Sequence, residues 1–230
     1  MADFDEKSAQ VPLRAASSLE GTLSLPQPRE NARGLVLFAH GSGSSQFSSR
    51  NRYVASVLQS AGLATLLFDL LTPSEEALDL RTGELRFNIA LLAERLLGAV
   101  DWARENEETR HLKIGCFGSS TGGGAALMAA AQRPEEIRAV VSRGGRPDLA
   151  DAFLADVMAP TLLIVGGNDD AVLKLNRGAM RQFRVETQLH IVPRATHLFE
   201  EPGALEEVAQ AAAKWFVRHL GGNPGAKKPL

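Results

Sequence analysis

Residues 114–127 constrain the fold of this chain more than any other segment. They read Ile-Gly-Cys-Phe-Gly-Ser-Ser-Thr-Gly-Gly-Gly-Ala-Ala-Leu, an apolar run that ends in a Gly-x-Ser-x-Gly turn and continues into small residues. A turn this tight between a strand and a helix forces its middle residue, Ser120, into strained backbone geometry, and Gly118 and Gly122 lack the Cβ atoms that would collide there. The segment predicts a strand, a nucleophile elbow at Ser120 and a helix packed closely on a sheet.

A serine lifted out of a sheet in this way is a nucleophile for acyl transfer when a histidine can reach it. The backbone N–H of Thr121, at the start of the helix, would point at an oxyanion formed there. Ser119 is the competing nucleophile, although it is not centred between two glycines. An ordinary Gly/Ser-rich surface turn is the structural alternative, and the strand and helix around the turn argue against it.

Short apolar runs alternate with helical periodicity along the rest of the chain. Continuous apolar runs occupy residues 34–39, 64–69, 112–117, 139–142, 161–165 and 188–192, as expected of parallel strands buried on both faces. Helices are expected between them, most clearly at 53–61, 87–105 and 205–216. This order predicts an α/β fold with a doubly wound, mostly parallel sheet.

A single domain at residues 19–220 accounts for these elements. Residues 1–18 are expected to be an N-terminal extension without the apolar core of a secretory signal, and residues 221–230 a disordered tail. The segment 143–160 has room for one short helix and is too short for a cap domain. Residues 71–85 are expected to form a charged loop at the rim of the site.

Composition excludes several classes of function. Lys and Arg number 25 against 27 Asp and Glu, a net charge of −2, so the sequence predicts no binding of nucleic acid and no polybasic membrane contact. The single cysteine, Cys116, allows no internal disulfide and no thiol cluster for a metal. No apolar run has the length of a membrane span. We expect a cytoplasmic protein that acts on a small molecule without metal or cofactor; no oligomeric state follows from the sequence.

Ligands of doubly wound sheets bind at the carboxyl ends of the strands, so the residues there are candidates for a site. After the first predicted strand, the turn from His40 to Ser44 would let the Ser42 N–H point at the same spot as the Thr121 N–H, completing an oxyanion hole. A phosphate loop is the alternative, but the turn lacks a P-loop lysine and the full dinucleotide-binding glycine pattern. His40 is expected to pack or hydrogen-bond beside this turn.

A carboxylate and a histidine follow later strands. Asp169 would orient a histidine, or alternatively cap the next helix, for which Asp170 is better placed. Asp170 and Asp148 are the competing acids. His197 lies in the loop after the last strand, and Ser120, Asp169 and His197 reproduce the Ser…Asp…His order of the α/β-hydrolase triad.

Two arginines, Arg143 and Arg146, follow the strand at 139–142 with a glycine pair between them. They would be able to clamp a substrate carboxylate. The alternative is surface pairing with Asp148, Glu200 or Glu201.

Five segments together resemble an α/β-hydrolase of the dienelactone-hydrolase-like branch, in particular the bacterial hydrolase domains sometimes joined to phosphoribosyltransferases. These segments are 40–44, 82–87, 118–122, 142–148 and 195–202, and the likeness spans about residues 21–220. The resemblance implies a serine hydrolase of carboxylic esters, thioesters or lactones, with Ser120, His197 and Asp169 as its triad. Dienelactone hydrolases carry a cysteine where this chain has Ser120, so their lactone specificity is not carried over.

Three other functions fit the same scaffold. One is an acyltransferase or perhydrolase, in which something other than water takes the acyl group. The second is a non-catalytic binding module, and the third a helper domain whose substrate arrives through a partner protein. For an uncapped hydrolase we expect a preference for small acyl groups.

Overall fold

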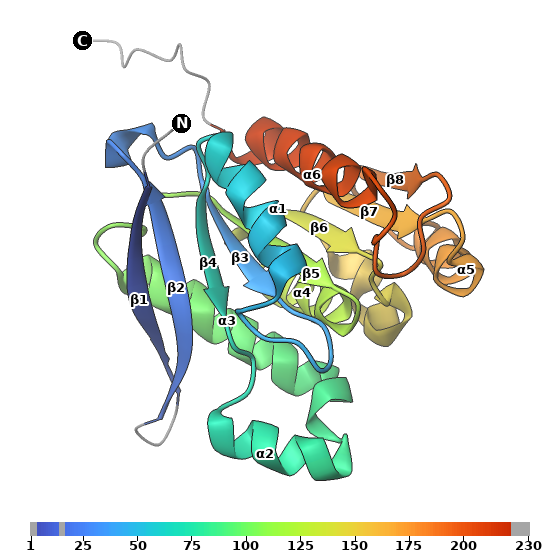
Figure 1. The fold of residues 1–230 in the computed structure, drawn as a ribbon, viewed down its shortest axis with the longest axis horizontal. Coiled ribbons are helices and arrows are strands. Elements are labelled where there is room, and N and C mark those ends of the chain that lie inside the picture. The colour runs from blue at the N-terminus through green and yellow to red at the C-terminus, as the bar shows by residue number, and fades with distance from the viewer. Residues whose placement is uncertain (1–3, 14–16, 222–230) are drawn as a thin grey trace.

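Eight strands form one sheet, in the order β1-β2-β4-β3-β5-β6-β7-β8, in the computed structural model, which describes residues 4–13 and 17–221 (Figure 1). The strands are β1 (Phe4–Pro12), β2 (Ser18–Pro26), β3 (Leu35–Ala39), β4 (Ala64–Phe68), β5 (Ile114–Ser119), β6 (Ile137–Arg143), β7 (Thr161–Gly166) and β8 (Thr187–Val192). β1 and β2 run antiparallel to their neighbours, and every pairing from β4 across to β8 is parallel. The prediction of a mostly parallel sheet is confirmed.

Helices cover both faces of this sheet (Figure 1). They are α1 (Ser49–Ser60), α2 (Pro73–Thr82), α3 (Ile89–Glu105), α4 (Thr121–Gln132), α5 (Asp170–Ala179) and α6 (Ala204–Leu220), with short 3₁₀ segments η1 (Arg29–Asn31), η2 (Leu85–Phe87) and η3 (Pro147–Asp156). Leu35 and Leu37 of β3 pack in the core with α3 and α4, whereas Val36 and Phe38 pack in the core with α1 and α6. Successive strand residues point to opposite faces, so one continuous apolar run supplies both cores. The doubly wound arrangement is confirmed.

Residues 4–12, predicted as part of an N-terminal extension, instead form edge strand β1, which pairs with β2 along its whole length. Ala9 and Val11 are its buried residues, and they alternate with exposed polar ones. This two-residue period is typical of an antiparallel strand at a sheet edge, and it differs from the continuous apolar runs of the parallel strands. The predicted disordered tail is residues 221–230, and all of it except Gly221 lies outside the described residues.

The segment 71–85, predicted as a loop, is mostly the helix α2. Its start has a capping box: the Thr72 hydroxyl accepts from the Glu75 N–H at 3.3 Å, and the Glu75 carboxylate accepts from the Thr72 N–H at 2.8 Å. Pro73 occupies the first turn, and Gly83 ends the helix in the left-handed conformation, with φ of 69°. Figure 1 shows α2 beyond the carboxyl ends of β3 and β4.

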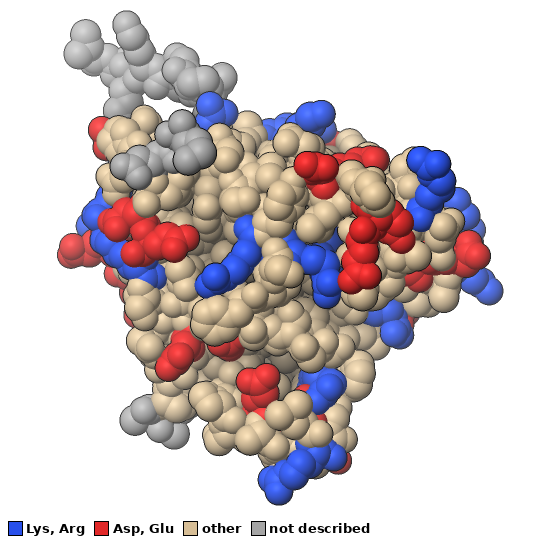
Figure 2. Space-filling view, viewed as in Figure 1, with Lys and Arg blue, Asp and Glu red and all other residues tan. Residues whose placement is uncertain are grey.

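Between β6 and β7 the chain contains only η3 as regular structure, so no cap domain is evident in the described part of the chain. None of the helices in that part combines the length and apolarity needed to cross a lipid bilayer. Acidic and basic side chains are interspersed over the face in Figure 2, with basic ones in its middle, over α1. On this face they form no continuous basic surface of the kind that holds a nucleic-acid backbone.

Candidate active site

The turn between β5 and α4 has the geometry of a nucleophile elbow. Ser120 has φ of 51° and ψ of −118°, a left-handed backbone conformation that non-glycine residues rarely adopt. A Cβ at Gly118 would collide with the carbonyl oxygen of Gly122, and one at Gly122 with that of Ala39. Both glycines are therefore required for a turn this close to the sheet.

The two neighbouring serines of the elbow differ in what they can reach. Ser119 is 2% exposed, and its hydroxyl donates to Oδ1 of Asn51 on α1 at 2.9 Å. Ser120 is half-buried and lines a cavity of about 200 Å³ together with His197. Ser119 lines the cavity as well, but its hydroxyl proton is engaged by Asn51, so of the two elbow serines Ser120 is the one whose hydroxyl is available there.

The two predicted oxyanion donors lie side by side. Thr121 is the first residue of α4, where the helix leaves backbone N–H groups without intrahelical acceptors. The Ser42 N–H donates to the Thr121 hydroxyl at 3.0 Å, which joins the turn after β3 to the first turn of α4. The predicted oxyanion hole therefore requires a substrate oxygen to displace the Thr121 hydroxyl from the Ser42 N–H or to share that donor with it.

His40 makes two hydrogen bonds that fix the turn at residues 40–44, called the oxyanion turn below. Its Nε2 accepts from the Leu70 N–H at 3.0 Å, so the ring proton lies on Nδ1, which is 3.0 Å from the Gly41 carbonyl oxygen and donates to it. Burial lowers the pKa of His40 and favours this neutral form. The predicted hydrogen-bonding role of His40 is confirmed.

His197 and Asp169 are in direct contact. Nδ1 of His197 is 2.7 Å from Oδ2 of Asp169, while Oδ1 of Asp169 accepts from the Val172 N–H at 3.4 Å and caps α5. The expectation that Asp170 is the better cap is wrong, because Asp170 is already the first residue of the helix and is exposed. Asp148, the other competing acid, is paired with Arg146.

The two candidate substrate-binding arginines have different surroundings. Arg146 makes a bidentate pair with Asp148, at 2.8 and 2.7 Å, which is the surface pairing given as the alternative. Arg143 is 7% exposed and lines the same cavity as Ser120. Arg50, at the start of α1, lines that cavity too. Sequence reasoning missed Arg50, because it belongs to no motif and follows no strand directly.

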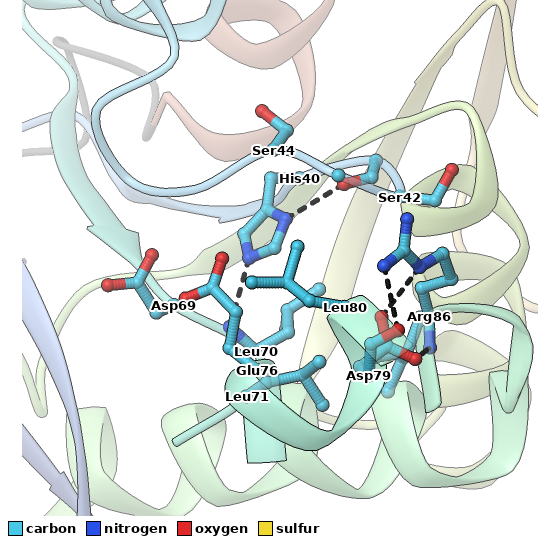
Figure 3. Close-up of a pocket in the computed structure, with 13 residues that line it drawn as sticks. His40, Ser42, Ser44, Asp69, Leu70, Leu71, Glu76, Asp79, Leu80 and Arg86 are labelled. Atoms are coloured by element: carbon cyan, nitrogen blue, oxygen red, sulfur yellow. Dashed lines mark hydrogen bonds and ion pairs between the residues drawn. The ribbon is translucent and has the colours of Figure 1, made fainter. Parts of the chain in front are cut away.

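A second, smaller cavity of about 80 Å³ is also lined by the turn at residues 40–44 (Figure 3). Its apolar wall consists of Leu70, Leu71, Leu80 and Leu92, and it shares Gly41, Ser42 and Ser44 with the cavity at Ser120. Figure 3 shows the Arg86 guanidinium between Asp79 and Ser42. Arg86 is held there by Asp79, with 2.6 Å between Nε and Oδ2. No sequence pattern predicts this leucine-lined cavity, because one of its walls is the helix α2, in a segment expected to be a loop.

No three His, Cys, Asp or Glu side chains among residues 4–13 and 17–221 are grouped so that they could hold a metal ion. The catalytic roles of Ser120, Asp169 and His197, and the oxyanion roles of Ser42 and Thr121, stay predictions. What the structure adds is their placement: Asp169 touches His197, Ser42 touches Thr121, and Ser42 lines one cavity with Ser120 and His197.

A family model and a solved structure that resemble this chain carry the same family description. The model of the dienelactone hydrolase family matches residues 21–220. A crystal structure described as a dienelactone hydrolase from Anabaena variabilis is 59% identical, with a TM-score of 0.91, and the match covers 94% of this chain and 99% of that one. Est1E from Butyrivibrio proteoclasticus has the same fold at 17% identity, with a TM-score of 0.77 over 92% of this chain and 98% of that one.

A Mycobacterium tuberculosis protein with the name "Putative phosphoribosyl transferase" is 57% identical over 205 residues. The match covers 89% of this chain and 44% of the relative, so this chain spans less than half the length of the curated relative.

Proposed function

Because this chain belongs to the dienelactone hydrolase family, we propose that it is a serine hydrolase that cleaves small carboxylic esters, thioesters or lactones through an acyl-enzyme on Ser120. The observation that carries the proposal is the contact of His197 with Asp169 at the cavity that Ser120 lines. Family membership supports hydrolysis in general, and the site supports the serine mechanism.

In this proposal, Oγ of Ser120 attacks the substrate carbonyl carbon while Nε2 of His197 takes the hydroxyl proton. Asp169 accepts the Nδ1–H of His197, which fixes the tautomer and stabilises the imidazolium. The Thr121 and Ser42 N–H groups donate to the oxyanion, and loss of one such donor typically costs about 10²–10³-fold in rate. The tetrahedral intermediate then expels the alcohol, to which His197 returns the proton.

Water completes the cycle. His197 removes a proton from a water molecule that attacks the acyl-enzyme, and Ser120 leaves as the restored hydroxyl. None of these steps requires a group other than the side chains and backbone amides of this site.

The leucine-lined cavity supports a small acyl group. A cavity of about 80 Å³ has room for several water-sized groups, since one such group needs about 10–15 Å³. This space suits an acyl chain of two to four carbons better than a long one.

The name of the M. tuberculosis relative points to phosphoribosyl transfer, but this chain matches less than half of that protein. The match covers 89% of this chain, so it must share most of residues 21–220, which match the hydrolase family. We therefore propose ester hydrolysis for this chain and not the activity in that name.

The experiment is a rate screen of the purified chain with 4-nitrophenyl acetate, 4-nitrophenyl butyrate, an acyl thioester and a δ-lactone. We expect Ser120→Ala to lower kcat by more than about 10³-fold on every substrate that is cleaved. Ser119→Ala is the matched control and should retain most of the rate, because its hydroxyl only bonds Asn51. Turnover that survives Ser120→Ala would contradict the proposal.

A further inference from the structure

Arg143 carries a buried positive charge that no acidic side chain among residues 4–13 and 17–221 pairs with. Its Nε and Nη1 atoms are buried and donate to no acceptor within these residues. The acidic residues expected as its partners do not pair with it: Asp148 pairs with Arg146, and Glu200 pairs with Arg50. Glu201 accepts from the Thr196 N–H with Oε1, and its Oε2 is buried without a hydrogen bond to any described residue. A buried cation costs free energy unless something compensates it.

The backbone of Arg143 is fixed against the nucleophile. Its carbonyl oxygen accepts from the Ser120 N–H at 3.1 Å, and the residue pairs with Ser119 in the register of β5 and β6. The Phe199 ring centroid lies 5.9 Å from the guanidinium carbon, which supports one side of the cation without supplying a negative charge. The guanidinium is thus held in place by the same elements that place Ser120.

Arg50 adds a second positive charge to the same cavity. Its Nη1 lies 3.3 Å from Oε1 of Glu200, and its Nε is buried and donates to no acceptor in the described residues. Burial and the nearby Arg50 lower the pKa of Arg143 to about 10, which leaves it charged at neutral pH. Two arginines beside one cavity, with three buried nitrogen atoms that donate to no acceptor in the described residues, make a site for an oxyanion.

The position of His197 decides which part of a substrate would meet these arginines. An ester has two arms, and the leaving oxygen of the alcohol arm must lie within reach of His197 to receive its proton. His197 lines the cavity with Arg143 and Arg50, and is absent from the lining of the leucine-lined cavity. Ser120 also lines only the arginine-side cavity, so the carbonyl carbon must lie there as well. On this assignment the alcohol arm stays beside His197 and the arginines, and the acyl arm passes Gly41, Ser42 and Ser44, which both cavities share, toward the leucines.

We propose that the alcohol part of the substrate carries an anionic group, a carboxylate or a phosphate, which Arg143 binds with support from Arg50. This rests on the proposed hydrolysis at Ser120 and names the substrate class: short acyl esters of anionic alcohols. The planar guanidinium of Arg143 suits either anion, because both present two oxygens to paired N–H donors. Arg143 determines specificity, and the hydrolytic step remains with Ser120 and His197.

The test uses acetyl esters that differ only in the charge of the alcohol part. The carboxylate arm is 4-acetoxybenzoate against its methyl ester, and the phosphate arm is 4-acetoxyphenyl phosphate against its dimethyl ester. We expect kcat/KM to favour the anionic member by about 10–100-fold, mostly through KM, as is typical of hydrogen bonds to a charged group. The arm with the larger preference identifies the anion.

Arginine variants test which residue causes the preference for anionic esters. Arg143→Gln should reduce the ratio of anionic to neutral kcat/KM by at least about tenfold, and Arg143→Lys by less, since it keeps the charge and loses the paired donors. Arg146→Gln is the matched control and should leave the ratio unchanged, because Arg146 is paired with Asp148. Comparing ratios cancels the intrinsic reactivity of each ester.

Wild-type protein that hydrolyses the neutral esters through Ser120 without favouring either anion would overturn this inference and leave the proposed function intact. A preference that survives Arg143→Gln would also overturn it. If that variant fails to fold, competitive inhibition of wild-type neutral-ester hydrolysis by 4-hydroxybenzoate and by phenyl phosphate, but not by phenol, is the expected result. Equal inhibition by phenol would contradict the site. Absence of all ester hydrolysis would instead overturn the proposed function.

Discussion

Asp169 contacts His197 with one carboxylate oxygen and the N-terminus of α5 with the other, at 2.7 Å from Nδ1 and 3.4 Å from the Val172 nitrogen. Helix capping and histidine orientation were alternatives for this residue in the sequence, and one side chain serves both geometries. The helix thereby fixes the direction from which the carboxylate meets the imidazole.

This double contact allows stability and catalysis to be separated. Asp169→Asn keeps a good capping side chain, so the free energy of unfolding should change little, while turnover falls by about 10⁴-fold because the amide favours the wrong histidine tautomer. Asp169→Ala should lose the same activity and, in addition, about 1 kcal/mol of stability from the cap.

Two measurements on both variants check this separation: kcat with 4-nitrophenyl butyrate, and the free energy of unfolding in urea. Asp170→Asn is the control and should be nearly as active as wild type, because Asp170 is exposed and makes no contact with His197. A larger loss in Asp170→Asn than in Asp169→Asn would show that the acid is misassigned.

A second prediction concerns the acid sensitivity of the oxyanion turn. Burial lowers the pKa of His40 in the folded protein, so between the folded and unfolded pKa values the unfolded chain binds the extra proton. The contribution of neutral His40 to stability is therefore complete above the unfolded value, about 6.5, and decreases as the pH falls below it.

The measurement is the free energy of unfolding of wild type and His40→Gln in urea, at several pH values from about 8 to about 5. The stability advantage of wild type over the variant should narrow toward acid pH. His111→Gln, at an exposed histidine, is the matched control. An advantage that stays constant across the range would contradict the neutral, buried state of His40.

A third prediction concerns acyl length. Acetyl, propionyl and butyryl esters should show higher kcat/KM than decanoyl esters, because chain atoms beyond the leucine-lined cavity gain less than the ~0.8 kcal/mol per methylene of full burial. Rates should also show no jump when the substrate forms micelles, since no cap domain is evident in the described part of the chain. Values of kcat/KM that rise steadily to long chains would mean that an acyl tunnel exists.

The parts of the fold that could be predicted are those whose signal is local. β3 to β7 contain continuous apolar runs, and the elbow glycines are dictated by the close approach of the turn to the sheet. β1 was assigned to an N-terminal extension because its alternating pattern also fits a polar segment, and β2, almost all of it inside the predicted domain, was not predicted as a strand. α2 was missed because Asp79 is its only buried residue, so no apolar stripe marks it. Its capping box, Thr72 with Glu75, was the available signal.

The candidate site also has a part that the sequence predicts and a part that it does not. Ser120, Asp169 and His197 could be predicted, because each follows a strand whose carboxyl end faces the site. The difference between Arg143 and Arg146 was not, since both flank the same glycine pair and only the folded chain shows which one meets Asp148. Arg50 reaches the site through the packing of α1, which no short motif records.

The most direct test of the account is to find the residue that carries the acyl group. Wild-type protein treated with a fluorophosphonate should gain one adduct, and peptide mass spectrometry should place it on Ser120. Ser120→Ala should gain none, and Ser119→Ala should be labelled like wild type. An adduct on Ser119, or active protein that takes up no adduct, would contradict the assignment of Ser120 as the nucleophile.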